Sequence, residues 1–228
     1  MTQIKTTIFI AGDSTACDYN ESARPMTGWG QRLPEFFIPA IRVINAALPG
    51  RSSKSFIDEG QLALVRDQMQ TGDFFLIQFG HNDQKDDAAR HTEPESGYRT
   101  YLTRYIDVAR SKGATPVLLT SVNRYRFDGV GRLIPTHGQY PAAVLGLGAA
   151  LKAPVIDITE KSRVLFEELG PERALKLFLN LAPNQHPNYP EGVADRTHFA
   201  PEGAWAIAKL VVEGIREQDL ALAQYLKQ

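Results

Sequence analysis

The chain has 228 residues, of which 43% are hydrophobic, and this is enough to build one globular domain with a sizeable core. Lysine and arginine number 25 against 26 for aspartate and glutamate, and the net charge of -1 gives no electrostatic reason to expect nucleic acid or an anionic membrane as a partner. Cys17 is the only cysteine, which excludes an internal disulfide and a cysteine-rich metal site.

The N-terminal segment has one lysine and a short apolar stretch. It lacks the long apolar region and the small-residue cleavage site of a signal peptide. No stretch of the sequence approaches the roughly 20 apolar residues that span a bilayer. We therefore expect a cytoplasmic protein without a membrane partner.

Five short apolar runs, partly β-branched, predict the strands of a sheet. They occupy residues 4–11, 41–45, 74–79, 116–121 and 155–158, and each is bounded by glycine, proline, asparagine, aspartate or serine. Near-continuous apolar strands are typical of a sheet that is covered on both faces.

Segments with helical spacing of apolar residues alternate with these runs. They lie within residues 56–69, 98–109 and 144–151, and the final helix begins near Pro201 and carries an apolar face as far as Ile215. The alternation predicts an α/β fold of three layers, with a five-stranded, mostly parallel sheet and helices on both faces. Because no repeat or linker divides the chain, we expect a single domain over residues 1–228.

Candidate functional residues follow the first three predicted strands. Ser14 follows the first strand, Gly50 the second and Asn82 the third. In an open α/β sheet, ligands bind outside the carboxyl ends of the strands, near the point where the strand order reverses. With the common strand order 2-1-3-4-5, these three residues converge. A hydroxyl, a backbone N–H at a glycine and a carboxamide are the components of a nucleophile with an oxyanion hole.

A candidate base for Ser14 lies just before the final helix. Residues 84–97 and 181–197 are polar and are expected to be irregular, and the second of these segments leads into His198. Asp195, three residues before His198, is able to accept a hydrogen bond from Nδ1 and leave Nε2 facing Ser14. The G-x-S-x-G motif of the α/β-hydrolase fold is absent, so a different serine hydrolase scaffold is required.

The motifs around these residues resemble the four blocks of the SGNH (GDSL) hydrolases. These are GDS, an isolated glycine after the second strand, GHND and D-x-x-H, in this order along the chain. Within that superfamily, five longer stretches resemble the rhamnogalacturonan acetylesterases: GDST at 12–15, GWGQ at 28–31, NAALPGRSSKSF at 45–56, IQFGHNDQK at 77–85 and THGQYP at 136–141. The resemblance covers nearly the whole chain.

The resemblance implies a flavodoxin-like fold and a serine esterase without a cofactor. Its substrate would be a pectin-derived, rhamnogalacturonan-type oligosaccharide, from which it removes O-acetyl groups through an acetyl-serine intermediate. Ser14 would be the nucleophile, with Asp195 and His198 as its triad partners. The N–H groups of Ser14 and Gly50 and the side chain of Asn82 would form the oxyanion hole.

Three further residues are candidates for substrate contact. Arg196 stands where the resemblance leads us to expect a small residue, and its guanidinium suits the carboxylate of galacturonate, although it could equally point to solvent. Trp29 suits stacking on a sugar face, with packing in the core as the alternative. Arg51 belongs with Arg124 and Arg126 to the basic residues that suit a carboxylate.

Two other functions stay open at this point. A lipase or acyl-thioesterase on the same scaffold needs an apolar groove, whereas the predicted loops are polar. A non-catalytic carbohydrate-binding protein is the second alternative, and an intact triad argues against it. His91, His137 and His186 show no metal-ligand spacing, and no glycine-rich nucleotide motif is present, so we expect neither a metal nor a nucleotide.

Overall fold

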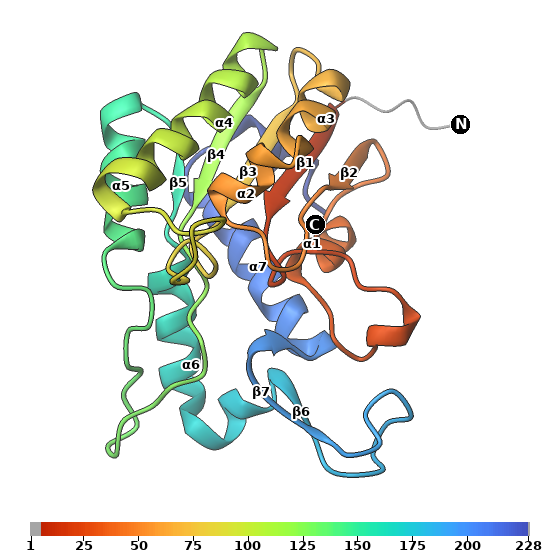
Figure 1. Ribbon diagram of the computed structural model, residues 1–228. Coiled ribbons are helices and arrows are strands. Elements are labelled where there is room, and N and C mark those ends of the chain that lie inside the picture. Colours follow the sequence, from red (N-terminus) through yellow and green to blue (C-terminus); the bar gives the residue numbers. More distant parts are fainter. Residues whose placement is uncertain (1–5, 228) are drawn as a thin grey trace.

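The computed structural model describes residues 6–227, so residues 4 and 5 of the first predicted strand lie outside the described part. Five parallel strands form the central sheet in the order β2-β1-β3-β4-β5 (Figure 1). They are β1 (Thr6–Gly12), β2 (Ile41–Asn45), β3 (Phe74–Gln78), β4 (Thr115–Leu119) and β5 (Val155–Ile156). Ile10 of β1 is in register with Asn45 of β2 and with Leu76 of β3. The predicted fold class and strand order are confirmed.

Seven α-helices and four short helical turns occur in the described part of the chain. The α-helices are α1 (Trp29–Arg32), α2 (Ser53–Asp58), α3 (Gln61–Gln68), α4 (Arg99–Ser111), α5 (Tyr140–Leu151), α6 (Ile158–Leu175) and α7 (Pro201–Glu217). The short turns are η1 (Glu21–Ala23), η2 (Leu33–Phe36), η3 (Pro94–Tyr98) and η4 (Ala221–Tyr225). The helical pattern over residues 56–69 therefore belongs to two helices. Gly60 separates them because its φ of 80° lies in the left-handed region.

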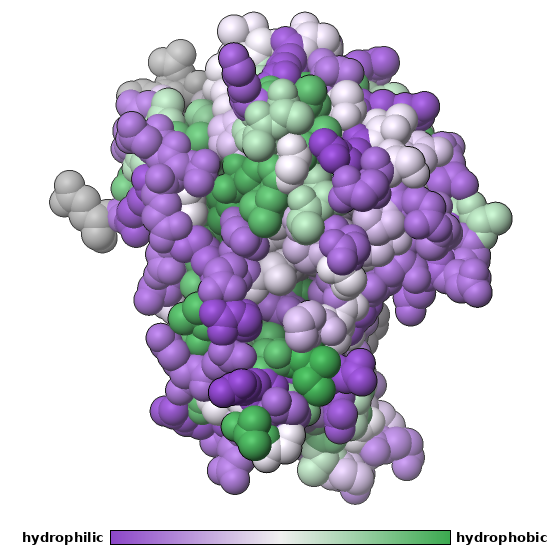
Figure 2. Space-filling model, turned by 90° about the vertical axis from the view of Figure 1, so that its left-hand side faces the viewer, coloured by the Kyte–Doolittle hydropathy of each residue, from purple (hydrophilic) through white to green (hydrophobic). Residues whose placement is uncertain are grey.

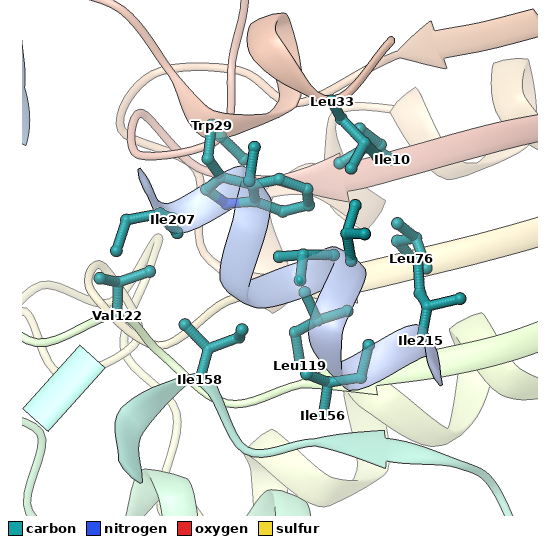
Figure 3. Packing of buried hydrophobic residues seen from close by; sticks show 14 of the residues in the cluster. Ile10, Trp29, Leu33, Leu76, Leu119, Val122, Ile156, Ile158, Ile207 and Ile215 are labelled. Atoms are coloured by element: carbon teal, nitrogen blue, oxygen red, sulfur yellow. The ribbon is translucent and has the colours of Figure 1, made fainter. Parts of the chain in front are cut away.

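The side chains of the strands alternate between two apolar clusters, one on each face of the sheet. Ile8 and Ile10 face the cluster that includes α1, α6 and α7, whereas Phe9 and Ala11 face the cluster formed with α2, α3, α4 and α5. Figure 3 shows the first cluster, in which Ile207 and Ile215 of α7 lie over the sheet. This layered packing fixes the positions of the strand ends that carry the site.

The segment predicted to be irregular over residues 181–197 is partly a strand. β6 (Phe178–Leu181) and β7 (Val193–Phe199) form an antiparallel two-stranded sheet beyond the carboxyl edge of the main sheet (Figure 1). The prediction missed β7 because most of its residues are only half-buried or exposed, so it carries no apolar run. Asp195 and His198 consequently lie on a strand and not in a loop.

The surface seen in Figure 2 is mainly hydrophilic, with hydrophobic side chains gathered in separate patches. Within residues 6–227, no helix combines the length and the apolar character needed to cross a membrane.

Candidate active site

Ser14 lies on a tight turn directly after β1. The Asp13 carboxylate accepts hydrogen bonds from the backbone N–H of Thr15 at 2.9 Å and from its hydroxyl at 2.8 Å. The Asp13 carbonyl accepts a further bond from the N–H of Ala16 at 3.1 Å. These bonds hold the turn so that the half-buried Ser14 projects its hydroxyl outside the carboxyl edge of the sheet.

The GWGQ stretch supports this turn by close approach of two backbone segments. The N–H of Gly30 donates to the carbonyl of Ala16 at 3.1 Å. A Cβ atom on Gly28 would lie only 2.1 Å from the carbonyl oxygen of Cys17, and one on Gly30 would lie 2.5 Å from that of Ala16. Only glycine allows the two segments to approach this closely.

Trp29 is a core residue, and the prediction that it stacks on a sugar is wrong. Its side chain is fully buried, and its indole N–H donates to Oε1 of Gln78 at 2.7 Å. Figure 3 shows the ring between α7 and the sheet. The structure agrees with the alternative that Trp29 packs in the core.

The structure brings Ser14, His198 and Asp195 together in one line of hydrogen bonds. Nε2 of His198 lies 2.9 Å from Oγ of Ser14, and Nδ1 lies 2.7 Å from Oδ2 of Asp195. The other carboxylate oxygen of Asp195 accepts from the backbone N–H groups of Thr197 at 2.7 Å and His198 at 2.9 Å. The carboxylate is thereby fixed, and it orients the imidazole toward the serine.

Asp195 is held in its ionised form. Burial acts to raise the pKa of this carboxyl, but the hydrogen bonds and charge of His198 outweigh that effect and place the pKa below its usual range. An ionised carboxylate at Nδ1 is suited to stabilise the imidazolium that forms when His198 takes a proton.

The three predicted oxyanion donors lie on the loops that follow β1, β2 and β3. Among the described residues, no acceptor meets the backbone N–H of Ser14 or of Gly50, and Gly50 has a φ of 77°, which favours glycine. The Asn82 amide donates to the carbonyl of Arg51 at 3.0 Å, which ties the loop after β3 to the loop after β2. An amide held by one N–H keeps its second N–H for a ligand.

Two buried carboxylates connect these loops. Nδ1 of His81 lies 3.4 Å from Oδ2 of Asp13, so the residues preceding Asn82 and Ser14 contact each other. Asp83 accepts from the N–H of Ser53 at 3.1 Å and from the N–H of Gly80 at 3.0 Å. Burial raises the pKa of Asp83 to about 6, although hydrogen bonds from Ser53 and Thr92 act in the opposite direction.

The hollow above Ser14 is polar. It has a volume of about 390 Å³ and is lined by Ser14, His81, Asn82, Gln84, Lys85, Arg124, Thr197 and His198. Gln84 and Lys85 were not among the predicted site residues, although they directly follow the GHND motif. Such a lining suits a hydroxylated or charged ligand better than an acyl chain.

Two predicted substrate contacts lie elsewhere. Arg51 does not line this hollow, because its guanidinium donates to Glu59 at 2.8 Å and to the carbonyl of Pro49 at 2.9 Å. Arg196 lies in a neighbouring hollow, where its Cζ atom is 5.9 Å from the centre of the Tyr125 ring. The guanidinium of Arg196 is therefore oriented by Tyr125 and not by the triad.

At the carboxyl edge of the parallel sheet, a serine is hydrogen-bonded to an imidazole, and the imidazole is hydrogen-bonded to a carboxylate. This is the arrangement of a serine hydrolase. The model of the GDSL-like lipase/acylhydrolase family matches residues 10–206. The chain belongs to this family and is a carboxylic ester hydrolase.

Relatives with assigned names cover almost the whole chain. Rhamnogalacturonan acetylesterase RhgT of Bacillus subtilis is 48% identical over 96% of this chain and 93% of its own. A rhamnogalacturonan acetylesterase of Emericella nidulans is 28% identical over 96% of this chain and 89% of its own. The solved structure of YxiM from Bacillus subtilis superimposes with a TM-score of 0.81 at 30% identity, over 94% of this chain and 57% of YxiM.

Proposed function

We propose that this protein is a serine acetylesterase that removes O-acetyl groups from rhamnogalacturonan-type oligosaccharides. The observation that carries the proposal is the 48% identity with RhgT over nearly the full length of both chains. The hydrogen bonds between Ser14, His198 and Asp195 support the chemistry, and the polar hollow around them supports a carbohydrate substrate.

The reaction proceeds through an acetyl-serine. Nε2 of His198 takes the proton of the Ser14 hydroxyl as Oγ bonds to the acetyl carbonyl carbon. The bond from that carbon to the sugar oxygen then breaks, and His198 returns the proton to this oxygen. Water next attacks the acetyl-serine by the same route, with His198 as base and then as acid. The products are acetate, the free sugar hydroxyl and regenerated Ser14.

The negative oxygen of each tetrahedral intermediate requires donors that are already in place. We assign this role to the N–H groups of Ser14 and Gly50 and to the amide of Asn82. The two backbone groups have no acceptor among the described residues, and the bond from Asn82 to Arg51 holds the amide. Preorganised donors of this kind are worth more in the transition state than in the ground state.

Asn82→Ala is expected to lower kcat by roughly 10² to 10³, because one oxyanion donor is lost. The free energy of unfolding should fall by only about 1 kcal/mol, since the substitution also removes the bond to the Arg51 carbonyl. Steady-state rates over a range of p-nitrophenyl acetate concentrations measure kcat, and thermal unfolding measures the stability. An unchanged kcat with lower stability would assign Asn82 a structural role alone.

A lipase or acyl-thioesterase is not favoured, because it needs an apolar groove beside the nucleophile. Every side chain that lines the hollow at Ser14 is polar or charged. Comparing p-nitrophenyl esters of increasing acyl length tests this point. We expect the acetyl ester to have the highest kcat/KM, and a maximum at a long acyl chain would overturn the assignment to acetyl groups.

Acetate release tests the sugar specificity. Acetylated rhamnogalacturonan oligosaccharides should release acetate with a higher kcat/KM than acetylated xylan oligosaccharides of equal length. Quantifying acetate after a fixed time, with p-nitrophenyl acetate as a reference substrate, gives both values on one enzyme preparation. Equal rates on the two glycans would leave an acetylesterase without preference for pectin-derived sugars.

A further inference from the structure

A second hollow adjoins the active site on the side of β7. Its volume is about 480 Å³, and its lining includes Arg124, Tyr125, Arg126, Pro135, Thr136 and Arg196. Arg124 also lines the hollow at Ser14, so the two hollows are neighbours that share this residue.

The backbone places the basic residues of this hollow side by side. The N–H of Tyr125 donates to the carbonyl of Arg196 at 2.8 Å, which joins the segment after β4 to β7. The carbonyl of Arg126 accepts from the N–H of Ile134 at 2.8 Å, which closes the loop between them. Arg196 lies over the ring of Tyr125, and Arg124 is held by the carbonyls of His81 and Thr136.

Three guanidinium groups line this hollow without a compensating carboxylate. Within residues 6–227, no carboxylate oxygen lies within 4.0 Å of a guanidinium nitrogen of Arg124, Arg126 or Arg196, and the lining contains no aspartate or glutamate. Elsewhere in the chain, arginines such as Arg90 and Arg163 form ion pairs. Arg126 and Arg196 are exposed and Arg124 is half-buried, so an anion that enters this hollow meets positive charges that no carboxylate offsets.

We propose that this second hollow is a subsite for the carboxylate of a uronic acid residue linked to the acetylated sugar. The inference rests on the proposed function and adds the place where the protein would bind a carboxylate of that substrate. A guanidinium presents a planar fork of donors that matches a carboxylate, and uronates are ionised at neutral pH. The acetyl ester then lies at Ser14 while the neighbouring carboxylate lies between Arg126 and Arg196.

Inhibition of p-nitrophenyl acetate hydrolysis tests the subsite without requiring the sugar to be a substrate. Two inhibitors are compared, both of them rhamnogalacturonan oligosaccharides without acetyl groups. One has free, ionised carboxylates and is called the acidic form, and the other has its carboxyls methyl-esterified. We expect the acidic form to inhibit at a concentration about tenfold lower than the methyl ester. Added salt should weaken inhibition by the acidic form and leave the methyl ester unaffected, because only the former depends on charge.

The double variant Arg126→Gln/Arg196→Gln should raise the inhibition constant of the acidic form about tenfold and bring it to that of the methyl ester. Arg216→Gln, an exposed arginine in the last turn of α7, is the matched control and should retain the wild-type difference. Equal inhibition by the two forms in the wild type, or an unchanged constant in the double variant, would overturn the subsite. Failure of acetate release from acetylated oligosaccharides would instead refute the proposed function.

Discussion

Ser14→Ala is expected to lower kcat on p-nitrophenyl acetate by a factor on the order of 10⁶, because no other group replaces the attacking oxygen. Its Oγ lies 2.9 Å from Nε2 of His198. Since the side chain is only half-buried, the fold should persist, and the free energy of unfolding should change by less than about 1 kcal/mol. Steady-state kinetics and chemical denaturation measure the two effects.

Ser111→Ala is a suitable control for this variant. Ser111 is exposed at the end of α4, and its hydroxyl bonds only to the carbonyl of Val108. The control should retain the wild-type rate. If Ser14→Ala retained more than a few per cent of the activity, the nucleophile would have to be a different residue.

Asp195→Asn is expected to lower kcat by about 10⁴, the loss seen when the carboxylate of a serine hydrolase triad is neutralised. The carboxylate accepts from Nδ1 of His198 at 2.7 Å and fixes the tautomer that leaves Nε2 free. An amide nitrogen at this position is a donor, so it favours the opposite tautomer. The amide oxygen still accepts from the N–H groups of Thr197 and His198, and the backbone of β7 should be retained.

The rate of Asp195→Asn should be compared with that of Asp219→Asn. Asp219 is exposed and has a φ of 48°, a conformation that asparagine also adopts, so this control should have little effect on rate or stability. A fall in kcat of less than tenfold for Asp195→Asn would mean that another group orients His198.

The central sheet could be predicted because its strands are buried on both faces. A run such as Phe74–Gln78, in which every residue is buried, is visible in the sequence as a continuous apolar segment. The prediction did not name α6, and it missed β7, for different reasons. Gly170 and Pro171 interrupt the helical pattern of α6. β7 belongs to a two-stranded ribbon, and most of its residues are polar and only half-buried or exposed.

The positions of the site residues were easier to predict than their contacts. Ser14 and Asn82 follow parallel strands, whose carboxyl ends meet at one edge, so topology alone brings them together. Trp29 was misjudged because residue type does not reveal burial, and the ion partner of Arg51 was not visible in the sequence either. The buried Gln78 accepts from Trp29, and Glu59, the residue directly after α2, pairs with Arg51.

The second hollow could not be predicted from the sequence because it depends on contacts between distant segments. Arg124 and Arg126 follow β4, whereas Arg196 lies on β7, and the hydrogen bond from Tyr125 to Arg196 brings them together. Neither segment has a motif that indicates this pairing.

Covalent labelling by an alkyl phosphonofluoridate tests whether Ser14 is the nucleophile, because this reagent reacts preferentially with a serine that a neighbouring base activates. The protein is treated until hydrolysis of p-nitrophenyl acetate stops, and it is then digested and analysed by mass spectrometry. We predict one phosphonyl group per chain, located on Ser14, with acetate release from acetylated oligosaccharides lost in parallel. A stoichiometric label on another residue, or acetate release that persists after complete labelling of Ser14, would show that Ser14 is not the nucleophile.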